Sequence, residues 1–119
     1  MRYEFTKEDE IFRNELREWI RNEISVDFNE WQGVDETGDD FEYSLEIRKK
    51  LAEKGWLTMA WPKEYGGQGA SYMKQVIFNE EMSYHRMPGR DGFGAKMLGP
   101  TLMVHGTEEQ KKRFLPPIA

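Results

Sequence analysis

Apolar residues recur along this chain at intervals of three and four, the spacing that places side chains on one face of an α-helix. No stretch shows the strict alternation of apolar and polar residues that is typical of a half-buried strand. The first helical run covers residues 7–23. Its apolar positions are Ile11, Phe12, Leu16, Trp19 and Ile20, and Ile24 follows them. This periodicity predicts an all-α protein.

Helix breakers and turn residues divide the rest of the chain into four further predicted helices. They cover residues 41–54, 72–87, 91–105 and 108–115. We expect Pro88 to end the third of the five helices, Pro100 to kink or break the fourth, and the prolines of LPPIA to stop the fifth. Residues 25–40 have no sustained period and predict a loop.

Capping signals support these boundaries. Thr6 with Asp9, and Thr107 with Gln110, have the spacing of a capping box. The other candidate caps are Ser71 and Asp39 or Asp40 at helix starts, and Gly55 and Gly106 at helix ends. A chain of 119 residues suits one domain. We therefore predict a single domain over residues 1–119, a compact bundle of about five helices around one core.

Composition excludes several classes of function. The chain has no cysteine, which excludes disulfides and thiolate chemistry. Its net charge of −5 argues against a nucleic-acid partner, which needs a basic surface to neutralise phosphates. No apolar run approaches the ~20 residues that span a membrane, and the N-terminus MRYEFTKEDE lacks a signal-peptide core. We expect a cytoplasmic protein.

The glycine-rich stretch AWPKEYGGQG, residues 60–69, invites comparison with a phosphate-binding loop. It lacks the GK[ST] ending of such a loop and follows no predicted strand. Gly89, Gly92 and Gly94 likewise miss the spacing of a dinucleotide-binding motif. We interpret these glycines as structural, with the aromatic residues of the stretch anchoring a turn, and we predict no cofactor-binding residue.

The titratable residues form no complete active site. Glu80 and Glu81 are adjacent, so their side chains diverge by about 100° on a helix. Glu81 and His85, at i and i+4, predict a surface pair. The two histidines, His85 and His105, are too few for a dedicated metal site. We predict no catalytic and no metal-binding residue.

The methionine and aromatic residues at helical spacing have two interpretations. Flexible thioethers fill cores, and they also suit a wall that meets a long apolar ligand. The core interpretation is favoured for this set: Met73, Phe78, Met82, Met87, Phe93, Met97 and Met103.

Three segments in order resemble the N-terminal helical domain of the acyl-CoA dehydrogenases. They are EDEIFRNELREWI, LAEKGWLTMAWPKEYGGQGAS and MLGPTLMVHGTEEQKKRFLPPI. The most specific blocks are W-P-x-E-Y-G-G-x-G and G-P-T-L-x-x-x-G-T-E-E-Q-K. The resemblance covers nearly the whole chain. It implies the first third of a flavoenzyme, in which FAD and the catalytic glutamate belong to later domains.

The resemblance also implies a role for one segment. The family's N-terminal domain lines one wall of the acyl pocket, and by motif position that wall includes Gly89, Arg90, Phe93 and Met97. Arg90, Phe93 and Met97 are spaced to share a helical face. The acyl class stays open between branched, aromatic and steroid-derived groups. Arg90 is expected to point to solvent, to a CoA group or to a polar substrate.

The full-length enzyme would then bind FAD and an acyl-CoA, pass electrons to an acceptor of the electron-transfer flavoprotein type, and form homo-oligomers. This part alone is expected to bind no FAD and to be inactive. Two alternatives remain: a stand-alone helical binding or interaction module, and a domain of a related acyl-CoA oxidase.

Overall fold

The computed structural model describes residues 4–24 and 40–119. These residues form five α-helices, one 3-10 turn (Lys63–Tyr65) and one π-helical turn, and they contain no strand. The all-α prediction with five helices is therefore confirmed. Helix α2 begins at Asp40. The predicted loop lies outside the described residues, and so do the side chains of the two candidate caps, Asp39 and Asp40.

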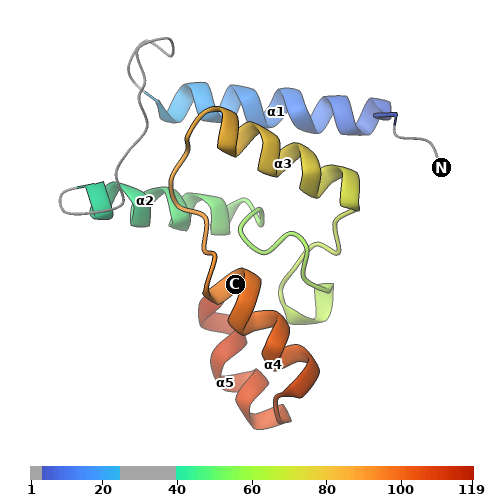
Figure 1. Cartoon of the computed structure of the whole chain (residues 1–119), viewed down its shortest axis with the longest axis vertical. Coiled ribbons are helices and arrows are strands. Elements are labelled where there is room, and N and C mark those ends of the chain that lie inside the picture. Colours follow the sequence, from blue (N-terminus) through green and yellow to red (C-terminus); the bar gives the residue numbers. More distant parts are fainter. Residues whose placement is uncertain (1–3, 25–39) are drawn as a thin grey trace.

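Helices α1 (Lys7–Glu23) and α3 (Tyr72–Tyr84) lie side by side, with α2 (Asp40–Glu53) next to them (Figure 1). The predicted capping box of α1 is present: the Asp9 amide donates to Thr6 Oγ1 at 3.2 Å, and the Thr6 amide donates to Asp9 Oδ2 at 2.9 Å. Gly55 follows α2 in the left-handed region with φ +73°, as predicted for a C-terminal cap.

Helix α3 is shorter than the sequence suggested. It ends at Tyr84, so the predicted end at residue 87, before Pro88, is wrong. Arg86 adopts a left-handed φ of 52°, and the Met87 amide donates to the Met82 carbonyl at 2.9 Å. These features are those of a Schellman-type helix end, a position that glycine usually occupies. An arginine there gives no sequence signal of a helix end.

The predicted fourth helix begins at Gly94 rather than at residue 91, and Pro100 does not break it, because Leu98 and Gly99 both keep helical backbone angles. It consists of the π-turn, Gly94–Leu98, followed by α4, Gly99–His105, with Pro100 in the first turn of α4. Gly106 caps α4, in an extended conformation.

Helix α5 (Glu108–Ile118) begins at the predicted capping box of Thr107 and Gln110. It then continues through Pro116 and Pro117, so the predicted stop at residue 115 is wrong. Both prolines lie in the last turns. The carbonyls they leave without a helical donor belong to Lys112 and Arg113, which are exposed and reach water.

The buried side chains gather in two clusters, where the sequence predicted one core. The α1–α3 cluster joins α1, α2 and α3 and includes Leu16, Ile47 and Met82. The Trp61 cluster is smaller: Trp61, from the loop between α2 and α3, packs with Ala95 and Leu115. Helices α4 and α5 form a hairpin that projects from the layer of the other helices (Figure 1). Trp61 thus connects the hairpin to that layer.

Leu16 gives a direct test of the α1–α3 cluster. Its side chain is fully buried, so Leu16→Ala leaves a cavity and is expected to lower the free energy of unfolding by about 2–5 kcal/mol. Ile11→Ala, on the same helix at 66% exposure, is the matched control and should cost less than about 1 kcal/mol. Urea denaturation followed by circular dichroism measures both. Equal losses in the two variants would contradict the packing described.

Candidate functional site

The four predicted wall residues lie on the segment that leads from α3 into α4, and Gly89 is buried within it. Gly89 has a φ of +95°, and a Cβ there would lie 2.9 Å from both Ile47 Cγ2 and the Arg48 backbone nitrogen of α2. The Arg48 Nε donates to the Gly89 carbonyl at 3.2 Å. Gly89 therefore acts through its backbone, by holding this segment against α2.

Arg90 is half-buried and lies outside any helix, so the prediction that it shares a helical face with Phe93 and Met97 is wrong. Its Nη1 donates to Ser83 Oγ at 3.1 Å. This hydrogen bond connects the segment back to the end of α3.

Phe93 and Met97 are exposed, at 82% and 60%. Leu98 at 48% and Val104 at 74% extend the same segment, and we call these four residues the apolar face. The core interpretation is correct for Phe78, Met82 and Met87, and it is wrong for Phe93 and Met97. An apolar set of this kind is expected to meet a partner or a ligand.

The π-turn beneath the apolar face is held from two sides. The Asp91 Oδ1 accepts from the Gly94 amide at 2.8 Å. The Trp61 indole Nε1 donates to the Ala95 carbonyl at 2.8 Å, and this bond is buried. A Cβ at Gly99 would overlap the Trp61 ring, so only glycine permits this approach. Sequence reasoning missed both contacts, because they join residues that no local pattern relates.

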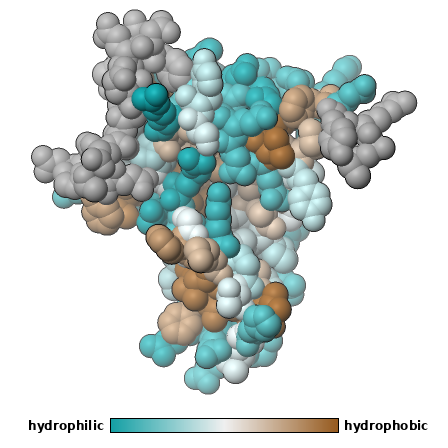
Figure 2. Space-filling model, viewed as in Figure 1, coloured by the Kyte–Doolittle hydropathy of each residue, from teal (hydrophilic) through white to brown (hydrophobic). Residues whose placement is uncertain are grey.

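An open groove of about 630 Å³ runs between the Trp61 loop, α3 and the start of α4. Its lining mixes the apolar Trp61 and Val104 with the polar Gln75, Asn79 and Lys96. In the view of Figure 2, apolar side chains likewise reach the surface among hydrophilic ones over the α4–α5 hairpin.

The glycine-rich loop uses its own amides. The Gly66, Gly67 and Gly69 amides donate to the carbonyls of Lys63, Pro62 and Trp61 at 3.1, 3.1 and 2.8 Å. Amides engaged in this way are not aimed at a phosphate. The interpretation of this loop as a structural turn is therefore supported.

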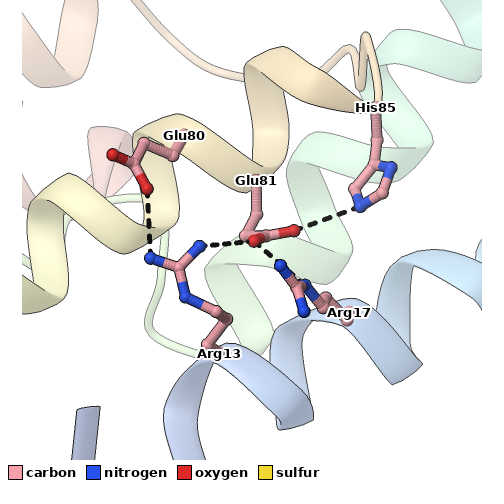
Figure 3. A network of polar contacts seen from close by, with 5 residues as sticks. All are labelled: Arg13, Arg17, Glu80, Glu81 and His85. Atoms are coloured by element: carbon pink, nitrogen blue, oxygen red, sulfur yellow. Dashed lines mark hydrogen bonds and ion pairs between the residues drawn. The ribbon is translucent and has the colours of Figure 1, made fainter. Parts of the chain in front are cut away.

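A buried carboxylate lies between α1 and α3 (Figure 3). Glu81 is 4% exposed, and its Oε1 accepts from Arg13 Nη1 at 2.6 Å and from Arg17 Nε at 3.0 Å. Its Oε2 lies 3.2 Å from His85 Nε2, and Arg13 also reaches Glu80 at 3.0 Å. The predicted pairing of Glu81 with His85 exists, but its placement on the surface is wrong, because α3 turns Glu81 inward and leaves Tyr84 outside.

The charges of this network set its protonation. Burial alone would raise the pKa of Glu81, but hydrogen bonds and charge from Arg17 and Arg13 outweigh it, so the pKa lies below the ordinary value. Burial lowers the pKa of His85, and Glu81 offsets this only in part. Glu81 is therefore ionised and His85 neutral near pH 7. An ionised carboxylate has no proton to donate, and two bound arginines make it a weak base, so the geometry favours a structural network over acid–base catalysis.

Within residues 4–24 and 40–119, no group of three metal-ligating side chains is found. None of the helices described is both long and apolar enough to cross a bilayer. The arrangement offers an apolar face on a π-turn, beside a groove, and a separate charged network.

The family profile described as "Acyl-CoA dehydrogenase, N-terminal domain" matches residues 6–119 of the chain. Among curated proteins, the acyl-CoA dehydrogenase IpdE1 of Mycolicibacterium smegmatis is 40% identical over 90% of this chain. The acyl-CoA dehydrogenase FadE26 of Mycobacterium tuberculosis is 36% identical over 100% of it. The chain spans 28% and 30% of the lengths of these relatives.

Solved structures agree with this match. The crystal structure of the ChsE4-ChsE5 complex from Mycobacterium tuberculosis superposes with a TM-score of 0.78 at 36% identity, covering 99% of this chain and 29% of the other. The structure of the Tcur3481-Tcur3483 steroid ACAD gives a TM-score of 0.78 at 38% identity, covering 99% of this chain and 30% of the other.

Glu81 provides a test of the charged network. Glu81→Gln leaves two arginines, one of them 12% exposed, without their buried counter-charge. We expect the free energy of unfolding near pH 7 to fall by about 3 kcal/mol. Glu80→Gln is the matched control on the same helix: its side chain is 56% exposed, and the expected loss is below about 1 kcal/mol.

The pH dependence follows from the lowered pKa of Glu81. Its stabilising contribution is fully present above the unfolded value of about 4.5 and is lost as pH falls through the folded pKa. Urea denaturation between pH 7 and pH 3 should therefore show a smaller acid-induced loss in Glu81→Gln than in the wild type. An identical acid profile in the two proteins would count against the assignment.

Proposed function

This chain belongs to the acyl-CoA dehydrogenase family, and we propose that it is the N-terminal domain of a flavin-dependent member. The whole enzyme oxidises an acyl-CoA thioester between its α and β carbons, with FAD as the electron acceptor. The family match over residues 6–119 and the identity to several acyl-CoA dehydrogenases support this proposal.

Within this chain, the observation that supports the proposal is the exposed apolar face. Phe93 and Met97 are large, apolar and outward-facing on a chain that spans less than a third of its relatives. Large exposed apolar side chains next to one another favour a contact that the isolated part does not supply. We assign this face to one wall of the acyl pocket, whose other walls and FAD belong to the rest of the enzyme. The part alone is then inactive.

The substrate we propose is a bulky, ring-bearing acyl-CoA of the steroid-derived class. The support is the likeness to the Tcur3481-Tcur3483 protein, which is described as a steroid ACAD. A phenyl ring and a flexible thioether, from Phe93 and Met97, can pack against a flat polycyclic group. Gly89 is buried against α2, so it contributes backbone shape to the wall rather than a side chain.

The proposal extends to partners. The similar ChsE4-ChsE5 structure is that of a complex, which supports an oligomeric enzyme here. A dehydrogenase of this kind passes its electrons to a protein acceptor of the electron-transfer flavoprotein type, in the cytoplasm.

Flavin content and turnover test the function. The full-length protein that carries this domain should purify yellow, with the visible absorbance of a bound flavin. It should oxidise acyl-CoA in the presence of an artificial electron acceptor. The 119-residue part should do neither. A colourless full-length protein, inactive on acyl-CoA thioesters even with added FAD, would overturn the proposal.

Replacing the two exposed side chains tests the wall. Phe93→Ala and Met97→Ala in the full-length enzyme should change the ratio of kcat/KM for a steroid-ring acyl-CoA to that for butyryl-CoA by about tenfold. Phe114→Ala, at 42% exposure on α5, is the matched control and should leave the ratio unchanged. Steady-state kinetics with both substrates measure it. An unchanged ratio in both wall variants would remove Phe93 and Met97 from the pocket.

A further inference from the structure

We propose that Trp61 is a positioning residue for the acyl pocket wall. Its indole N–H holds the π-turn in register, and the register places Phe93 and Met97 where they select the acyl group. This inference rests on the proposed function of the apolar face. It adds a residue outside the wall that determines specificity through one hydrogen bond.

The π-turn is defined by backbone hydrogen bonds that skip one residue more than an α-helix does. The Leu98 amide donates to the Phe93 carbonyl at 2.8 Å, and the Gly99 amide donates to the Gly94 carbonyl. In α-helical register, the Gly99 amide would donate to the Ala95 carbonyl instead. The two registers therefore compete for the same donor.

Pro100 makes the π register incomplete without help. The next bond in that register would run from residue 100 to the Ala95 carbonyl, but a proline has no N–H. The Trp61 indole supplies the donor, at 2.8 Å in a buried position. A buried carbonyl that lost its donor would cost free energy, and a return to α-helical register would satisfy it with the Gly99 amide. Trp61 therefore stabilises the π register against the α register.

The indole is held in place from its own side. Trp61 is 4% exposed. Its amide donates to the Thr58 carbonyl at 3.0 Å, and its carbonyl accepts from the Gly69 amide at 2.8 Å. Gly99, which has no Cβ, lets the ring lie against the chain at the end of the π-turn. The loop thus presents a rigid donor, as a positioning residue requires.

The register decides where the wall side chains point. One residue corresponds to about 100° of rotation around a helix. A change of the π-turn to α-helical register shifts the hydrogen bonds by one residue. Phe93, at the start of the π-turn, would then rotate by about 100° relative to α4. A buried tryptophan that only fills volume would not set the register, because it would supply no donor to the Ala95 carbonyl.

The first experiment measures register without turnover. In the full-length protein, Trp61→Phe keeps a smaller aromatic ring, removes the N–H and loses part of the packing against Gly99. The rate of amide hydrogen exchange across residues 94–99 should rise by about tenfold, because one buried hydrogen bond is lost. Trp56→Phe is the matched control: Trp56 is 3% exposed but belongs to the α1–α3 cluster. It should leave exchange in residues 94–99 as in the wild type. No change with Trp61→Phe would overturn the inference, whatever the enzyme's activity.

A second substitution tests the chemical cause. Pro100→Ala restores a backbone N–H at the position that the π register needs. Combined with Trp61→Phe, it should return exchange across residues 94–99 toward the wild-type rate. A loss of packing at Trp61 would not be repaired by an amide at residue 100. Failure of this rescue would overturn the proposed competition for the Ala95 carbonyl.

The third experiment measures specificity. Trp61→Phe should shift the kcat/KM ratio of a steroid-ring acyl-CoA to butyryl-CoA by about tenfold, and Trp56→Phe should not. General destabilisation scales both substrates alike and cancels in this ratio. An unchanged ratio in an active enzyme would overturn the role of Trp61 in selection. A full-length enzyme inactive on every acyl-CoA would instead overturn the proposed function, while the exchange experiment still decides the register.

Discussion

The contact between the Trp61 ring and the chain at Ala95 and Gly99 is the constraint on which the arrangement of the two clusters depends. Trp61 belongs to the loop between α2 and α3, and its side chain packs with Ala95 of the π-turn and Leu115 of α5. Gly99 has no side chain where the Trp61 ring packs against it. The Gly69 amide donates a hydrogen bond to the Trp61 carbonyl. The hairpin is therefore attached by close packing and one directed hydrogen bond.

Local signals in the sequence predicted most helix starts, and long-range contacts explain the errors. Capping at Thr6, Ser71 and Thr107 depends on residues three positions apart, so it could be read directly. The end of α3 could not, because Arg86 takes the left-handed position without the glycine that usually marks it. Pro116 is typical of a helix stop, but in the exposed last turns of α5 it leaves only the Lys112 carbonyl without a helical donor, and the helix continues.

The geometry of the candidate site could not be predicted from the sequence. Periodicity shows that Phe93 and Met97 share an apolar pattern, but a core face and a partner face have the same pattern. Burial tells them apart, and it depends on α4 packing toward α5. Glu81 is the opposite case. Its charge suggested the surface, yet α3 turns it toward Arg13 and Arg17, a pairing 64 residues or more away in sequence.

The charged network and the apolar face lie on different elements of this domain. The charged network joins α1 to α3, where a buried carboxylate is costly unless both arginines meet it, so these residues constrain one another. The apolar face lies on the π-turn and α4, and its exposed side chains contribute little to folding. If these residues form the proposed wall, a change at Phe93 or Met97 alters what that wall accepts without unfolding the domain. The hydrogen bond from Trp61 to the Ala95 carbonyl connects the two regions. Trp61 belongs to a buried cluster, and we propose that its hydrogen bond sets the register of the turn that carries the apolar face.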